Sequence, residues 1–193
     1  AVIATFVCLL VGYPLAYIMA RADQKHQKIY LMLLMLPMWT NLLIRTYSIM
    51  AILDDGGFLN SLLNTSFHIV GTKGAVIFGM VYDFLPYMVL PIYTCISKID
   101  KNMWEAASDL GCNTFQVITK VIFPLTLPGV ISGITMVFIP ALTTFVISNL
   151  LGGSKILLIG NVIEQEFTQA SNWNLGSGLS TVMMLFIIIS MIM

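Results

Sequence analysis

One carboxylate stands inside an otherwise apolar stretch of the sequence, with aromatic residues beside it. Asp83 is flanked by Tyr82 and Phe84, and Tyr87 follows four residues later. On a helix, Tyr87 lies one turn beyond Asp83 on the same face. An ionisable group deep in an apolar segment is costly and usually functional, and aromatic faces attract cations. The chemistry that these residue types indicate is the binding of a positively charged solute.

A second charged residue, Arg45, also lies in an apolar stretch, together with Trp39 and Tyr47. If both stretches are helices crossing a membrane, Asp83 lies ~13 Å from the outer end of its helix and Arg45 roughly 6 Å from the outer end of its own. The long side chain of Arg45 can therefore reach Asp83. Two readings remain open: Asp83 lines a substrate pathway, or it forms a structural ion pair with Arg45. A switched pair would serve both purposes.

Other kinds of chemistry have less support in the sequence. His26 and His68 fall in two connecting segments on opposite sides of the expected membrane, so they cannot form a cluster within it. The three cysteines are scattered, without the CxxC spacing of a metal site or a disulfide framework. We interpret them as small apolar fillers, and we expect no bound metal or cofactor: Cys8, Cys95 and Cys112.

The composition indicates that these residues are held by membrane helices. Of the 193 residues, 58% are hydrophobic and 9% are charged, whereas soluble proteins carry about 25% charged residues. The formal net charge of zero gives nucleic acid no electrostatic attraction. A helix needs about 20 apolar residues to cross a bilayer, and backbone groups cannot stay unpaired in lipid. We expect an all-α, polytopic protein with a single transmembrane domain over residues 1–193, with spans at 1–20, 29–51, 74–97, 127–148 and 176–193.

Lysine and arginine residues gather in two of the connecting segments. Six of the nine lie in residues 21–28 and 98–124, and the segments 52–73 and 149–175 hold one each. Basic residues favour the cytoplasmic side of a membrane. We therefore expect the chain to start outside, to end inside, and to expose residues 98–124 to the cytoplasm.

Two further expectations concern the outer segment and the chain ends. Glu164 and Glu166 are either plain solvated residues or a funnel for cations, and residues 156–163 are too short to span, so they suit an interfacial or re-entrant helix. The chain begins without an initiator methionine and ends within an apolar run at Met193. We expect it to be a fragment truncated at both ends.

The cytoplasmic segment 98–124 has the signals of two short helices joined by a turn. Gly111 stands where a glycine ends a helix in a left-handed conformation. Asn113 and Gln116 have the spacing of a capping box that starts the next helix. These signals alone fit either an amphipathic loop packed on its own bundle or an element that docks to a partner.

A family resemblance favours docking. Glu105, Ala106 and Ala107 precede Gly111, and Val121-Ile122-Phe123-Pro124 follows it. This spacing resembles the EAA loop of permease subunits of ABC importers. Phe123 stands where many members have leucine, and Cys112 where many have alanine. The resemblance implies that Glu105, Ala106, Ala107, Gly111 and Pro124 form the loop that couples the permease to an ATPase.

The same resemblance implies a type I ABC importer permease-like helical bundle and a set of partners. These are a second homologous permease subunit, a cytoplasmic ATPase dimer, a periplasmic or extracellular substrate-binding protein, and the lipid bilayer. This chain lacks a GxxxxGK[ST] motif, and Gly152-Gly153-Ser154-Lys155 is only superficially similar to one. We therefore expect a pathway-forming subunit of the bacterial inner membrane that is not an enzyme, with ATP and Mg²⁺ bound by the partner ATPase.

Further stretches resemble the spermidine/putrescine permeases within this family. They are residues 11–17, 36–47, 82–101 and 152–163. The resemblance implies a polyamine substrate, carried inward by alternating access. It implies that the candidate pathway residues serve that cation: Asp83, Tyr82, Tyr87, Trp39, Arg45 and Tyr47.

Other classes stay open from the residues alone. An ABC permease for another small solute or ion would share parts of the pattern. An ATP-independent secondary transporter would predict ion-coupling residues at the midplane and inverted repeats, whereas this sequence has one such carboxylate and no evident repeat. A membrane enzyme is a weaker alternative, because no intramembrane cluster of histidine and carboxylate is present in the sequence.

Overall fold

The computed structural model describes residues 1–54, 56–57, 68–100, 103, 111–153, 156–170 and 172–192. Every regular element in these ranges is helical, as the composition predicts. Four helices are long and apolar enough to cross a membrane, or five if the bent pair α2–α3 counts as one span. The elements are α1 (Val2–Arg21), α2 (Gln24–Trp39), α3 (Leu42–Leu53), α5 (Lys73–Ser97), α7 (Thr114–Val117), the π-helix η1 (Ile118–Ile122), α8 (Phe123–Thr143), α9 (Val146–Leu151), α10 (Ile159–Thr168) and α11 (Trp173–Ile192).

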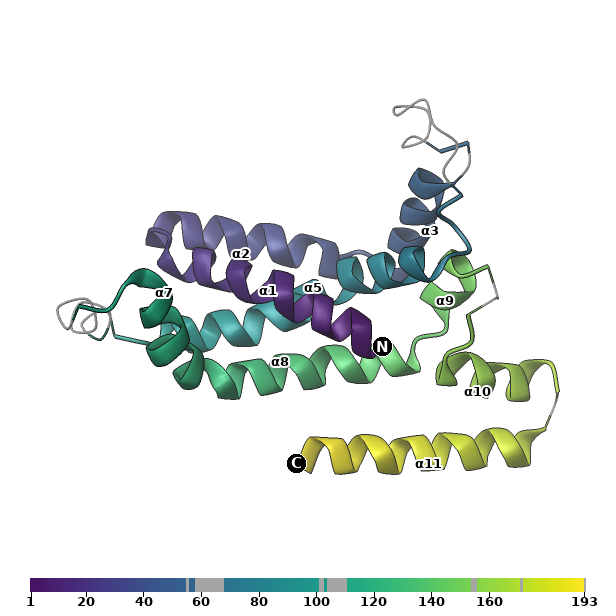
Figure 1. The fold of residues 1–193 in the computed structure, drawn as a ribbon. Coiled ribbons are helices and arrows are strands. Elements are labelled where there is room, and N and C mark those ends of the chain that lie inside the picture. The colour runs from purple at the N-terminus through teal and green to yellow at the C-terminus, as the bar shows by residue number, and fades with distance from the viewer. Residues whose placement is uncertain are drawn as a thin grey trace.

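Helix α5 is the centre of the bundle. Helices α1 and α8 both pack along it and contact each other, and α2 runs beside α1 and α5 (Figure 1). Glycines allow the close approach, because membrane helices gain little from the hydrophobic effect and rely on tight packing. A Cβ on Gly12 of α1 would lie 3.0 Å from Met88, and one on Gly133 of α8 would lie 2.8 Å from the sulfur of the same Met88. Met88 is therefore clamped between the two neighbouring helices.

The span expected over residues 29–51 is broken in the structure. Helix α2 starts earlier, at Gln24, and ends at Trp39, and α3 leaves it at 94° (Figure 1). The hydroxyl of Thr40 donates to the carbonyl of Pro37 (2.7 Å), and the side chain of Asn41 accepts from the backbone N–H of Leu43 (2.8 Å). Asn41 is an N-cap, which starts a new helix. The expected span is bent sharply here because proline and this cap lie within four residues of each other.

The span expected over residues 127–148 is displaced toward the N-terminus. Helix α8 begins at Phe123 with Pro124 in its first turn, ends at Thr143, and is followed by the separate helix α9. Proline in the first turn of a helix is favourable, because its missing N–H has no partner there in any case. Pro124 is thus tolerated in the first turn of α8, directly after η1.

At one end of the bundle, helices α9 and α10 are linked, as the α9–α10 unit, by Asn161. Its side chain is fully buried and bonds the side chains of Ser148 and Asn149. It also accepts from the backbone N–H of Leu158 (3.0 Å). The chain after α10 turns back into α11, which packs on α10 and the end of α8 and stands apart from the other helices (Figure 1).

Candidate functional site

The two charged residues that lie inside apolar segments meet in the structure. Nε of Arg45 on α3 is 3.4 Å from Oδ1 of Asp83 on α5. The side chain of Asp83 is completely buried, and that of Arg45 is 11% exposed. The pair joins α3 to α5 just beyond the bend, so the sharp turn after Trp39 is what carries Arg45 to Asp83. The ion-pair reading of the sequence is confirmed as geometry.

The polar contacts around this pair are incomplete. Charge-assisted N–H···O bonds are usually about 2.7–2.9 Å long, and this one is longer at 3.4 Å. Within the described residues, Nε and Nη1 of Arg45 and Oδ1 of Asp83 have no hydrogen-bond partner. The hydroxyl of Thr46 is 3.4 Å from Oδ2 of Asp83, but it lies closer to the carbonyl oxygen of Leu42, at 2.8 Å. The buried carboxylate is therefore neutralised but weakly hydrogen-bonded.

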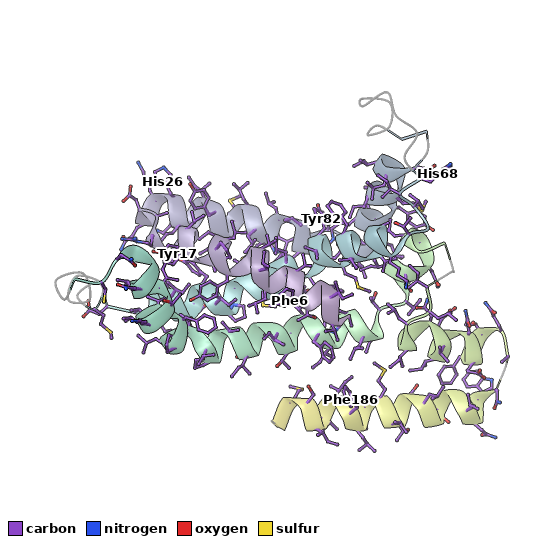
Figure 2. All side chains as sticks on the ribbon, in the orientation of Figure 1. Phe6, Tyr17, His26, His68, Tyr82 and Phe186 are labelled. Atoms are coloured by element: carbon purple, nitrogen blue, oxygen red, sulfur yellow. The ribbon has the colours of Figure 1, made fainter. Side chains whose placement is uncertain are left out.

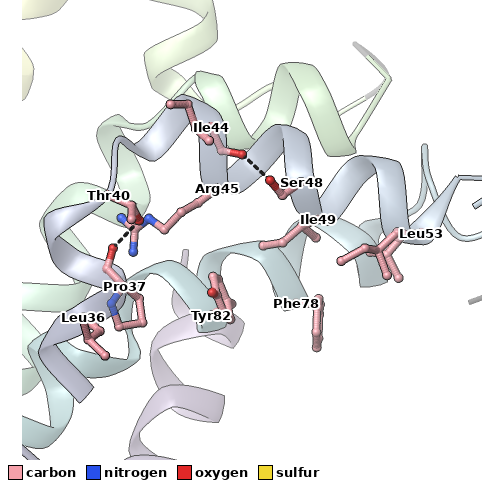
Figure 3. A pocket seen from close by; sticks show the side chains of 11 residues that line it. Leu36, Pro37, Thr40, Ile44, Arg45, Ser48, Ile49, Leu53, Phe78 and Tyr82 are labelled. Carbon is pink, nitrogen blue, oxygen red and sulfur yellow. Dashed lines mark hydrogen bonds between the residues drawn. The ribbon is translucent and has the colours of Figure 1, made fainter. Parts of the chain in front are cut away.

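A groove of about 590 Å³ lies against this pair. Figure 3 shows the guanidinium of Arg45 near the bend, with Pro37 and Thr40 close to it, while Tyr82 and Phe78 form the opposite wall. Arg45 lines the groove and Asp83 does not. The walls are mostly apolar and aromatic: Leu36, Pro37, Thr40, Ile44, Arg45, Ser48, Ile49, Ile52, Leu53, Phe78 and Tyr82.

The candidate pathway residues divide into two groups. Arg45 and Tyr82 line the groove, and Asp83 lies directly behind Arg45. Trp39 and Tyr47 are 76% and 52% exposed and are outside the groove lining. Tyr87 is also absent from it and instead contacts Phe84, with ring centroids 6.4 Å apart.

Sequence reasoning missed two residues of this site. Thr46 lies next to Arg45 in the sequence and is fully buried against Asp83, so its polarity within an apolar run was the available signal. Phe78 lies one turn before Tyr82 and shares its face on α5, which the helical repeat of the sequence could have shown.

At the other end of the bundle, Gly111 has a φ of +81°. The predicted left-handed conformation is confirmed. Among the described residues, a Cβ at this position would meet no atom within 4 Å, and the positive φ by itself favours glycine. Glu105, Ala106 and Ala107 lie outside the described residues.

The predicted capping box after Gly111 is also present. The side chain of Asn113 accepts from the backbone N–H of Gln116 (2.9 Å), and the side chain of Gln116 accepts from the backbone N–H of Asn113 (3.1 Å). Helix α7 then passes through η1 directly into α8. One continuous helical path therefore connects the turn at Gly111 to a membrane helix.

Tyr13 of α1 ties the start of α8 to the bundle. Its hydroxyl is 3.1 Å from the hydroxyl of Thr126, and its ring centroid is 5.7 Å from that of Phe123. A force applied to α7 and η1 therefore reaches α1 as well as α8. This contact could not be predicted from local sequence patterns, because the two residues are 113 positions apart.

The two histidines and the outer glutamates lie away from the groove. Figure 2 places His26 and His68 at opposite ends of the bundle, as expected. Glu164 and Glu166 lie on α10 and are partly buried rather than free in a loop. Glu164 accepts a hydrogen bond from the hydroxyl of Thr168 (3.2 Å) and borders a second, largely apolar cavity of about 490 Å³.

The basic residues mark one end of the molecule as cytoplasmic. Arg21 ends α1, Lys25 and Lys28 start α2, Lys98 caps α5 and Lys120 lies in η1. All of these positions are at the end of the bundle where α7 is found (Figure 1). The groove and the α9–α10 unit are at the opposite end, so the positive-inside rule places them on the outer side.

The chain resembles known transport proteins in sequence and in fold. Residues 12–193 match the family described as "Binding-protein-dependent transport system inner membrane component". The spermidine/putrescine transport system permease protein PotB of Haemophilus influenzae is 46% identical over 96% of this chain and 68% of its own length. PotB of Escherichia coli is 44% identical over 93% of this chain and 68% of its own length.

A solved structure shows the same fold with a distant sequence. It is the crystal structure of a bacterial ABC transporter involved in the import of the acidic polysaccharide alginate, with a TM-score of 0.75 and 15% identity. The match covers 98% of this chain and 74% of that one. The expected all-α, type I permease fold is thus confirmed, and the chain belongs to the family of inner membrane components of binding-protein-dependent transport systems.

Proposed function

We propose that this chain forms part of the membrane pathway of an ATP-driven importer for polyamines such as spermidine and putrescine. The observation that carries the proposal is the 46% identity to a spermidine/putrescine permease over 96% of the chain. The site agrees in chemistry: a groove with apolar walls and the aromatic ring of Tyr82 suits a methylene chain, and the carboxylate of Asp83 suits an ammonium group.

The coupling region supports ATP-driven transport rather than secondary transport. Gly111, the capping box at Asn113 and the path through η1 into α8 make a cytoplasmic element that continues into the bundle. A separate ATPase dimer docks there, through the segment containing Glu105, Ala106 and Ala107, and binds the ATP and Mg²⁺. A second permease subunit completes the pathway, and a binding protein delivers the solute from outside.

Uptake in cells tests this proposal. A strain lacking the gene is complemented with the full-length gene, and accumulation of radiolabelled spermidine is followed with and without depletion of ATP. We expect spermidine uptake to require both the gene and ATP. Excess unlabelled putrescine should reduce this uptake. Equal uptake with and without the gene would refute the polyamine assignment.

A further inference from the structure

The groove on the outer side contains a positive charge of the protein itself. The guanidinium of Arg45 lines the groove (Figure 3), whereas Asp83 is fully buried behind it. A cation entering the groove therefore meets a positive charge before it meets the carboxylate. The groove attracts a cation only when Arg45 moves away from Asp83.

The contact between the two side chains is suited to exchange. The Nε–Oδ1 distance is 3.4 Å, and three buried atoms of the pair have no hydrogen-bond partner in the described part of the chain. Few strong hydrogen bonds are lost when the guanidinium leaves. What cannot be left is the bare carboxylate, because an unpaired buried charge is strongly unfavourable. A second cation that takes its place on Asp83 therefore makes it easier for Arg45 to leave.

We propose that Arg45 and Asp83 form a latch that a polycationic substrate opens, with one ammonium group of the substrate replacing the guanidinium on Asp83. The inference rests on the proposed polyamine substrate and adds a role for a specific residue. The exchange keeps the net charge at Asp83 constant. The apolar walls at Leu36 and Phe78 contact the methylene linkers of the ligand, and Tyr82 offers its ring to an ammonium group.

The latch also selects for the number of charges on the ligand. Arg45 is tethered beside Asp83, so its effective concentration there is on the order of millimolar or more. A monovalent amine must compete with it from dilute solution. A polyamine held in the groove by one part of its chain presents its next ammonium group intramolecularly, and it competes on equal terms. Arg45 is thus a specificity-determining residue.

Opening the latch has a structural consequence at the bend. Arg45 lies in the first turn of α3, where its N–H donates to the carbonyl of Asn41 (3.1 Å). Its side chain connects α3 to α5 through Asp83. Exchange for a substrate ammonium removes this connection, so the link from Arg45 of α3 to α5 is lost only when substrate is present.

Direct binding measurements test the latch. The full-length protein with its partner permease and ATPases is purified in lipid nanodiscs, without binding protein, and titrated with spermidine or n-butylamine by calorimetry. The variants are Arg45→Gln, the double variant Arg45→Gln/Asp83→Asn, and Lys73→Gln as a control that removes an exposed cation from the same end of the bundle. In the open state, Arg45 has left Asp83. If about 10% or less of the unliganded protein is in this state, the apparent affinity for spermidine is weakened about tenfold or more.

We expect Arg45→Gln to bind spermidine about tenfold more tightly than the unchanged protein. Its preference for spermidine over butylamine should fall. The double variant Arg45→Gln/Asp83→Asn should not show this gain in spermidine affinity. Lys73→Gln should match the unchanged protein. If Arg45→Gln binds spermidine equally or less tightly, or if Lys73→Gln shows the same gain, the latch does not exist.

A replacement variant and an uptake assay separate failure of the latch from failure of assembly or of the proposed function. If Arg45→Gln fails to assemble, Arg45→Lys replaces it: lysine keeps the charge but not the guanidinium, so a smaller gain in spermidine affinity supports the latch and unchanged affinity contradicts it. ATP-driven spermidine uptake by the unchanged system reports on the proposed function alone. Uptake without an Arg45 effect rejects the latch only, and absence of uptake rejects the function.

Discussion

The pair of Arg45 and Asp83 is compatible with both readings of the sequence, in which Asp83 either forms a structural ion pair or lines the substrate pathway. Either residue alone would be an unpaired charge in an apolar bundle, and the structure neutralises both by bringing them to 3.4 Å. Yet a purely structural pair has no need to border a groove of about 590 Å³. The position of Arg45 between groove and carboxylate is what favours a role in transport.

Separate assays of assembly and transport resolve these two roles. Asp83→Asn leaves the guanidinium of Arg45 without its partner, which costs about 3–5 kcal/mol for a fully buried pair and less here because Arg45 borders the groove. We expect reduced yield of assembled complex, restored when Arg45→Gln is added. Spermidine uptake per assembled complex should remain low in both variants. Recovery of uptake in the double variant would make Asp83 purely structural.

At the level of elements, local signals predicted local structure well. The left-handed Gly111 and the capping box of Asn113 and Gln116 follow from interactions over three or four residues, which a sequence displays directly. The broken span and the face of Tyr47, which follows the break, were not predictable in this way. A 94° bend reorients everything after it, so the helical repeat before the bend no longer says which residues face a groove.

The conformation of Gly111 leads to a prediction about coupling. An L-residue in the left-handed region costs about 1–2 kcal/mol, and asparagine tolerates it better than valine. Because a Cβ would meet no neighbour within the described ranges, Gly111→Asn should couple nearly normally, whereas Gly111→Val should misdirect the segment before it. We expect Gly111→Val to insert normally but to lose ATP-driven uptake or ATPase co-purification. Normal ATP-driven uptake together with normal ATPase co-purification in Gly111→Val would disprove the coupling role of this turn.

The packing of α10 against α8 gives a second prediction at this scale. A Cβ on Gly160 would collide with the backbone carbonyl of Thr143, whereas one on Gly178 of α11 would meet nothing within 4 Å. Gly160→Ala should lower the thermal midpoint of the purified protein. Gly178→Ala is the matched control and should be neutral or stabilising by about 0.5–1 kcal/mol. Equal midpoints for the two variants would show that α10 is not fixed at this contact.

The whole molecule leaves much apolar surface uncovered. Only 11% of the most apolar stretch of α11 is buried, against 56% for α5. Lipid covers part of this surface, and we expect a related permease to cover another part. Purification of the full-length system in mild detergent should therefore yield two permease subunits with an ATPase dimer. A single copy of this protein that transports alone would contradict the assembly.

The fold of the whole molecule does not identify the solute. The solved ABC transporter with a TM-score of 0.75 is involved in the import of an acidic polysaccharide, alginate, whereas the PotB relatives belong to spermidine/putrescine transport systems. Substrate charge must therefore be read from residues such as Asp83 and Arg45. The helical bundle supplies only their positions.

Transport by the purified system tests ATP-driven import of polyamines most directly. The full-length protein, its partner permease and ATPases are reconstituted into liposomes, with binding protein outside and ATP inside, and radiolabelled spermidine is measured in the lumen. We predict accumulation against a gradient that requires ATP and stops when the ATPase is inactivated. Spermidine movement that continues without ATP hydrolysis would contradict ATP-driven import. Absence of spermidine movement in a fully assembled system that hydrolyses ATP would contradict a polyamine substrate.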